Sequence, residues 1–303
     1  MSKNKNMNAS KKQFAIYIIA AFTIAYAFQI IASLFFKNGI QLAYTLTLMV
    51  SMLAPLLAVV ICGGKLRGMG FIPRLKGKIK WIFAALWLPM AFAVIGAALF
   101  FLAFPKSYDT TGAYMFSSLT EEQVAMLEEQ GVTFPLLVVS QVIQLLTYAP
   151  FLNMFFALGE EVGWRGYMYP ILKKKFGTNK GRIIGGIIWG VWHWPIMILA
   201  GYEYGTDYFG APFLGPVLFC FCTVVIGIIF DYWYEKTDCI WIPSLGHGAF
   251  NGAVGLGMLF FNPAFSKYTV IGPTPIGIVA MIPMIAYMVY ICIKERKKSE
   301  ITT

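Results

Sequence analysis

Eight long apolar stretches constrain this chain more than any other feature. They run over residues 14–36, 42–62, 81–104, 135–158, 183–200, 213–230, 240–261 and 276–293. Each is long enough, or nearly so, for a helix that rises about 1.5 Å per residue to cross about 30 Å of hydrocarbon. With 58% hydrophobic and 13% charged residues, the 303-residue chain is too apolar for a water-soluble domain. We therefore predict an all-α polytopic membrane protein, a bundle of about eight transmembrane helices.

The basic residues predict how these helices are oriented. If both termini are cytoplasmic, 20 of the 24 lysines and arginines fall in cytoplasmic segments. Such an excess is what the positive-inside rule requires, so we predict a multi-pass protein of the cell membrane with both termini cytoplasmic. The net charge of +10 then reflects orientation. It indicates an anionic lipid bilayer as a partner and no nucleic acid.

The chain is expected to form a single transmembrane domain over 14–293, between basic cytoplasmic tails at 1–13 and 294–303. The first apolar stretch is too long to be the core of a cleaved signal peptide. The run from Pro135 to Tyr169 is too long for one straight span. We expect Pro150 to kink it, or its outer part to lie outside the membrane, and we expect the helix to end before Pro170.

Five ionisable residues remain within or beside the spans once loops and tails are set aside: Glu160, Glu161, Arg165, His193 and His247. Ionisable groups inside a membrane are costly and usually functional. The simpler explanation is an interfacial glutamate pair and two histidines bonded to neighbouring helices. Counting about 1.5 Å per residue from the inner surface puts Glu160, His193 and His247 roughly 10–15 Å deep. Their similar depth favours one shared site.

Two pairs with helical spacing support that shared site. Glu161 and Arg165 are four residues apart, so the arginine can neutralise one carboxylate and leave Glu160 free. His247 and Asn251 have the same spacing. Glycines around both histidines allow neighbouring helices to approach closely.

A carboxylate, two imidazoles and a carboxamide are the parts of a hydrolytic site. Glu160 can take a proton from water, and His193 can hold that water or relay the proton. His247 and Asn251 can donate hydrogen bonds to the oxyanion that forms when a carbonyl is attacked. Such a site needs no serine or cysteine nucleophile.

The residues resemble the motifs of the CAAX protease and bacteriocin-processing (Abi) family of intramembrane proteases, which includes type II CAAX prenyl endopeptidases. The family's EExxxR motif is matched by Glu160, Glu161 and Arg165 in "EEVGWR". Its FxxxH motif is matched by His193 in "WGVWH", where Trp189 replaces the usual Phe and is expected to affect only local packing. Its HxxxN motif is matched by His247 and Asn251. The resemblance implies a catalytic core at about 135–261.

The resemblance leaves two mechanisms open. In one, Glu160 activates water without a metal. In the other, Glu160, His193 and His247 bind zinc and leave a fourth position for water. We favour the metal-free mechanism, with no cofactor, because Asn251 beside His247 suits an oxyanion hole. Glu161 could serve as a second carboxylate that orients an imidazole, which keeps the zinc alternative open.

A proton-coupled transporter, or a scaffold without turnover, would be a function of another class. The acidic and imidazole groups lie at one depth, which suits an enclosed active site better than a transport path across the membrane. The sequence also contains no visible inverted repeat, which many transporters have. We therefore predict an intramembrane endopeptidase whose active site opens toward the cytoplasmic side. Its expected substrate is a membrane-associated polypeptide, either a prenylated CAAX-type protein cut near its C-terminus or a precursor peptide.

Overall fold

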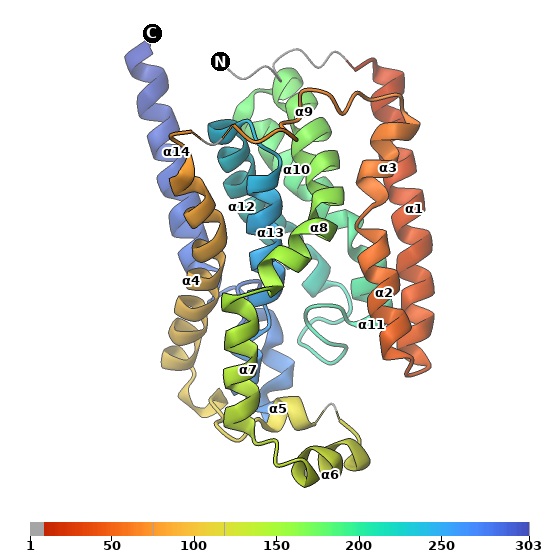
Figure 1. Cartoon of the computed structure of the whole chain (residues 1–303), viewed down its shortest axis with the longest axis vertical. Coiled ribbons are helices and arrows are strands. Elements are labelled where there is room, and N and C mark those ends of the chain that lie inside the picture. The colour runs from red at the N-terminus through yellow and green to blue at the C-terminus, as the bar shows by residue number, and fades with distance from the viewer. Residues whose placement is uncertain (1–8, 75, 118, 303) are drawn as a thin grey trace.

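The computed structural model describes residues 9–74, 76–117 and 119–302, and these residues form helices without strands (Figure 1). The helices of the bundle are α1 (Lys11–Lys37), α2 (Gln41–Ser51), α3 (Ala54–Ile61), α4 (Ile79–Ala103), α7 (Phe134–Leu146), α8 (Ala149–Glu161), η3 (Val162–Met168), α9 (Tyr169–Phe176), α10 (Thr178–Trp192), α11 (Trp194–Ala200), α12 (Leu214–Thr237), α13 (Trp241–Ala253) and α14 (Ile282–Thr302). Short helices η2 (Pro105–Ser107), α5 (Ala113–Phe116), α6 (Glu121–Glu129), η4 (Leu256–Phe260) and η5 (Pro263–Ile271) lie in the connections. The predicted all-α class is confirmed.

The described helices include fewer candidate spans than the eight predicted. Five are long and apolar enough to cross a membrane, or six if the bent pair α7 and α8–α9 is one span. Residues 240–261 do not form one long helix, because α13 ends at Ala253 and a 3₁₀ turn follows. Residues 276–281 form turns, so the apolar part of α14 is only 282–293. The prediction of eight full spans is therefore not confirmed.

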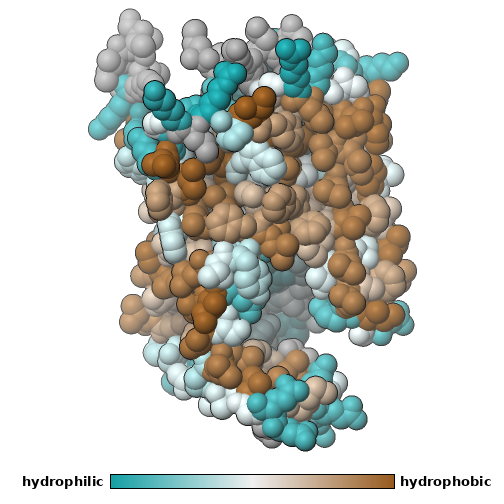
Figure 2. Space-filling view, viewed as in Figure 1, coloured by the Kyte–Doolittle hydropathy of each residue, from teal (hydrophilic) through white to brown (hydrophobic). Residues whose placement is uncertain are grey.

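The surface of the bundle fits contact with lipid. Figure 2 shows an apolar belt between two more hydrophilic ends. Large apolar side chains are exposed on several helices, for example Ile19, Leu42, Phe83, Val94, Leu102 and Val139. Such a contiguous apolar surface is unusual in a soluble protein and suits a bilayer. This agrees with a multi-pass membrane protein.

Helix α1 begins and helix α14 ends at the same end of the bundle (Figure 1). We call this the terminal end and the opposite end the far end. The loops after α1 and α4, and the helices α5 and α6, lie at the far end. A shared side for the termini agrees with the predicted topology, and its cytoplasmic location remains a prediction. Residues 1–8 of the predicted basic tail lie outside the described residues.

The expected bend near Pro150 is present. Helices α7 and α8 meet at 57°, and Pro150 lies in the first turn of α8. A helix does not end before Pro170, as predicted, but continues to Phe176. Proline fits because it lies in the first turn of α9, directly after the π-helical η3. π-Helical turns are rare and occur frequently at functional sites.

Close helix packing depends on glycines, as the sequence indicated. A methyl group at Gly248 of α13 would overlap the backbone of Pro150 and Met154 in α8. A methyl group at Gly186 of α10 would likewise overlap Val224 of α12. These two helix pairs can therefore lie against each other closely enough to bring their polar residues into one site.

A buried charge cluster, absent from our sequence analysis, joins four helices near the terminal end. Asp231 of α12 accepts hydrogen bonds from Lys173 of α9 at 2.7 Å and from Arg182 of α10 at 2.6 Å. Arg182 also pairs with Glu235 of α12 and Glu295 of α14. Hydropathy had placed Asp231 and Arg182 in loops, whereas both side chains are buried within helices. The cluster fixes these helices relative to one another.

Candidate active site

The structure brings the three predicted motifs together. Glu160 lies at the end of α8, His193 lies between α10 and α11, and His247 and Asn251 lie on α13. All four line one cavity of about 300 Å³, together with Trp189. Their catalytic roles remain predictions, and the shared cavity gives them a common place to act.

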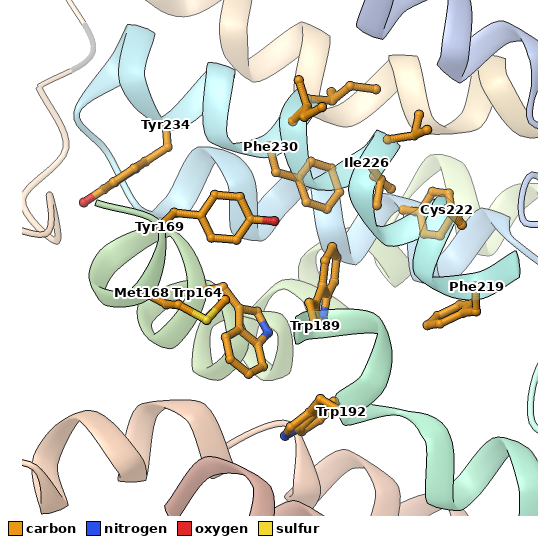
Figure 3. Close-up of a cluster of buried hydrophobic side chains, with 14 of the residues drawn as sticks. Trp164, Met168, Tyr169, Trp189, Trp192, Phe219, Cys222, Ile226, Phe230 and Tyr234 are labelled. Atoms are coloured by element: carbon orange, nitrogen blue, oxygen red, sulfur yellow. The ribbon is translucent and has the colours of Figure 1, made fainter. Parts of the chain in front are cut away.

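Two indole N–H groups hold the Glu160 carboxylate. Its Oε2 accepts a hydrogen bond from Trp189 Nε1 at 2.6 Å and another from Trp164 Nε1 at 3.1 Å. Figure 3 shows the two indole nitrogens turned toward the same space. Because Glu160 is only 2% exposed, these donors replace the water that its charge has lost. The expectation that Trp189 affects only packing is wrong, since a phenylalanine could not donate this hydrogen bond.

The second carboxylate orients His247 and neutralises Arg165. Glu161 Oε1 accepts from Arg165 Nη1 and is paired with His247 Nδ1, both at 2.9 Å. The predicted pairing of residues 161 and 165 is therefore present. Glu161 is fully buried and is not part of the cavity lining. It can act on a substrate only through His247, so its place is that of a positioning residue.

Arg165 completes this buried unit. Its guanidinium carbon lies 4.3 Å from the Trp189 ring centroid and 4.9 Å from that of Tyr169. The Nε and Nη2 atoms have no hydrogen-bond partner among the described residues. Glu161 and the faces of aromatic rings are therefore the groups that stabilise this buried cation.

The hydrogen bond that each imidazole makes through one ring nitrogen determines which nitrogen is left free to react. His193 Nδ1 lies 2.9 Å from the carbonyl oxygen of Trp189, which can only accept, so Nδ1 carries the proton. A neutral His193 then has its lone pair on Nε2. His247 Nδ1 donates to Glu161 in the same way. Each ring thus uses Nδ1 for support and leaves Nε2 for reaction.

Helix α1 contributes a residue that the sequence analysis missed. Gln29 donates from Nε2 to the carbonyl oxygen of Trp192 at 3.0 Å and accepts from the backbone N–H of Ile196 at 3.3 Å. These bonds satisfy backbone groups on both sides of the break between α10 and α11, where His193 lies. Gln29 is the one amide side chain between Phe14 and Phe36, and this was the available signal. Asn153, Tyr202 and Glu203 also line the cavity and were not predicted.

The cavity extends from Glu160 and the two histidines toward the far end. It follows α13 from His247 to Val254 and reaches Tyr44 in the first turn of α2. On the terminal side of Glu160, Gly159 packs on Leu53 and Gly163 packs on Pro55, so α3 lies close against α8 and η3. The opening of the site toward the cytoplasmic side remains a prediction.

The described side chains that could bind zinc are not arranged as a set of metal ligands. Within residues 9–74, 76–117 and 119–302, no three His, Cys, Asp or Glu side chains are grouped so that they could hold a metal ion. Glu160, His193 and His247 share the cavity without forming such a group. Metal dependence itself remains a prediction.

Comparisons with known proteins match this part of the chain. The family model described as "Type II CAAX prenyl endopeptidase Rce1-like" matches residues 141–253, which include every predicted site residue. A curated protein described as "CAAX prenyl protease 2", from Methanococcus maripaludis, is 30% identical over 98 residues. That match covers 27% of this chain and 36% of the relative. Both comparisons support a protease. Residues 141–253 of this chain are thus similar to the Rce1-like type II CAAX prenyl endopeptidase family, and the chain spans about a third of the length of the curated relative that it matches.

Proposed function

We propose that this chain is an intramembrane endopeptidase that cuts a membrane-associated polypeptide near a hydrophobic anchor. The observation that carries the proposal is one buried cavity that contains the carboxylate of Glu160, the imidazoles of His193 and His247, and the amide of Asn251. These groups supply a base, a proton relay and oxyanion donors without a covalent nucleophile.

In the proposed reaction, Glu160 takes a proton from a water molecule that attacks the scissile carbonyl carbon. His193 Nε2, which is unprotonated in the neutral ring, accepts a hydrogen bond from the same water and orients it. The proton then passes to the leaving amine as the carbon–nitrogen bond breaks. Glu160 is thereby returned to its carboxylate form for the next turnover.

His247 and Asn251 stabilise the oxyanion in this mechanism. His247 donates from Nε2 only as an imidazolium, because Nδ1 is already bonded to Glu161. A positive His247 makes the site neutral overall, since Glu160 and Glu161 then balance Arg165 and His247. Glu161 thus supports the charge that the oxyanion needs.

The proposed substrate is a polypeptide with an apolar anchor, and the lipid bilayer is part of its binding environment. Met49, Met52, Phe250 and Val254 give the cavity apolar walls. The names of the relatives suggest a prenylated CAAX-type protein, and a precursor peptide with an apolar segment fits the same walls. Because the cavity lining runs from Glu160 toward Tyr44 at the far end, we propose that substrate enters from the far end.

The test compares one peptide with and without its membrane anchor. The full chain is purified in detergent and placed in liposomes, and cleavage products are identified by mass spectrometry. We expect the anchored peptide to be cut within a few residues of the anchor and the soluble version to be cut far more slowly. Equal rates for the two peptides would contradict the proposed substrate class. The absence of any cleavage, with transport of protons across the liposome instead, would contradict the protease.

A further inference from the structure

A second cavity continues the catalytic cavity toward the far end. It has a volume of about 280 Å³ and is lined by α5 residue Tyr114, by the end of α1 and by the loop after α11. Tyr44, Tyr202 and Glu203 line both cavities and form the junction between them. Figure 2 shows a recess at this end, between the α5–α6 region and the helices above it. A polypeptide that enters from the far end therefore passes Glu203 before it reaches Glu160.

Glu203 is the acidic residue at this junction, and no lysine or arginine accompanies it. Among the residues that line the two cavities, the acids are Glu160 and Glu203, and there is no basic residue other than the two histidines. Burial raises the pKa of Glu203 to about 7, although the Tyr202 hydroxyl favours its ionised form. Among the described residues that line the two cavities, no lysine or arginine compensates this carboxylate.

The surrounding loop holds Glu203 in a fixed position. Its backbone φ of 73° lies in the left-handed region, which non-glycine residues adopt only when the structure around them enforces it. The next residue, Tyr204, donates from its hydroxyl to Ile276 at 2.9 Å, and its carbonyl oxygen accepts from Thr269 at 2.7 Å. The preceding Tyr202 ring lies parallel to the His193 ring, with the centroids 6.4 Å apart. The loop that carries Glu203 is therefore anchored beside the His193 imidazole through Tyr202.

We propose that Glu203 is a specificity residue that binds a lysine or arginine side chain of the substrate, on the segment between the scissile bond and the far end. This inference rests on the proposed protease function. A cation at this position would form a charge-assisted hydrogen bond with this half-buried carboxylate. An uncharged substrate residue would leave the negative charge of Glu203 unpaired, and an acidic residue would be repelled by it. The cavity therefore selects for a positively charged substrate residue.

The experiment uses synthetic peptides that share one apolar anchor and a short Gly/Ser/Ala tail, with a single lysine moved along the tail. Each has a partner in which norleucine replaces lysine, so that length is kept and charge is lost. Parent protein, Glu203→Gln and Asp207→Asn are compared. Asp207 is a matched control because it carries the same charge in the same loop, is exposed and lines neither cavity.

We expect the parent protein to prefer lysine over norleucine by about tenfold in kcat/KM at one tail position. The preference should disappear in Glu203→Gln and persist in Asp207→Asn. Glu203→Lys should favour a glutamate at the same position. Comparing the lysine-to-norleucine ratio between the parent and variant proteins cancels the difference in membrane partition between the two peptides. A parent protein with no preference at any position, or a Glu203→Gln protein that keeps it, would overturn the proposal.

A binding measurement separates this inference from the protease proposal. Fluorescently labelled peptides are titrated into Glu160→Gln protein, with and without the added Glu203→Gln change, and Kd values are compared. Tighter binding of the lysine peptide that depends on Glu203 supports the subsite even if the parent protein cuts nothing, which would count only against the protease. Equal Kd values for lysine and norleucine peptides would refute the subsite even where cleavage is efficient.

Discussion

Replacing Glu161 with glutamine tests how the buried charges of the site depend on one another. Glutamine has nearly the same shape and can still accept from His247, but it leaves Arg165 as a cation with no carboxylate partner. Both side chains are 0% exposed, so water cannot compensate. Removing one partner of a buried ion pair costs about 3–5 kcal/mol. For a chain of this size, we expect the thermal midpoint to fall by roughly 5–10 °C.

The double variant Glu161→Gln with Arg165→Met distinguishes pairing from general damage. Methionine removes the unpaired cation and can pack its sulfur against the Tyr169 and Trp189 rings that now surround the guanidinium. We expect the double variant to recover at least half of the lost thermal stability. Its cleavage rate should stay low, because His247 has lost the anion that supports its positive form.

Thermal unfolding in detergent, followed by intrinsic fluorescence, measures the first effect, and peptide cleavage measures the second. Arg165→Met alone completes the thermodynamic cycle. If the two single changes lower the midpoint additively, residues 161 and 165 do not act as a coupled pair. If the stabilised double variant cleaves at the parent rate, the proposed role of Glu161 behind His247 is wrong.

Further predictions concern the base, the metal and the strained loop. Glu160→Ala and His193→Ala should abolish peptide cleavage in folded, membrane-inserted protein, whereas Asn251→Ala should retain activity reduced by about 10²–10³, the usual effect of losing one oxyanion donor. Parent-like rates in either of the first two would refute the mechanism. Chelators should leave activity largely intact, and metal analysis should find well under one zinc per chain; activity that is lost and restored with stoichiometric zinc would reverse our preference. Glu203→Gly should raise the free energy of unfolding by about 1 kcal/mol, because glycine adopts a φ of 73° without strain. A clear loss of stability in chemical unfolding would show that the side chain supports the loop.

Local spacing made part of the site predictable. Four-residue spacing on a helix fixes which side chains share a face, so the pairing of Glu161 with Arg165 followed directly from the sequence. The similar depths of the acid and the two imidazoles followed from helix rise alone. The predicted pairing is present because it depends on a single helix, whereas the depth of these groups in the membrane remains a prediction.

The remaining features depend on contacts between distant segments. Nothing in the local sequence of Gln29 indicates that it bonds across the break beside His193. Hydropathy places Asp231 outside the predicted span because it scores every aspartate as hydrophilic and takes no account of ion pairs. In the structure, the pairs with Lys173 and Arg182 allow this residue to be buried. Glu203 lies between two predicted spans, and only the tertiary structure places its loop against the cavity that contains Glu160.

The bonds that Gln29 makes also have a consequence for how the enzyme can be divided. The segment that matches the family begins at residue 141, yet helix α1 holds the backbone on both sides of His193. In the same helix, the Tyr26 hydroxyl donates to the carbonyl oxygen of Val191, and the carbonyl oxygen of Ala21 accepts from Trp192 Nε1. The segment at residues 141–253 therefore depends on α1 for the contacts at its centre. We expect an excised fragment of these residues to lack an ordered centre, and we expect two separately expressed pieces, cut within the loop at 63–70, to recover cleavage activity when they reassemble.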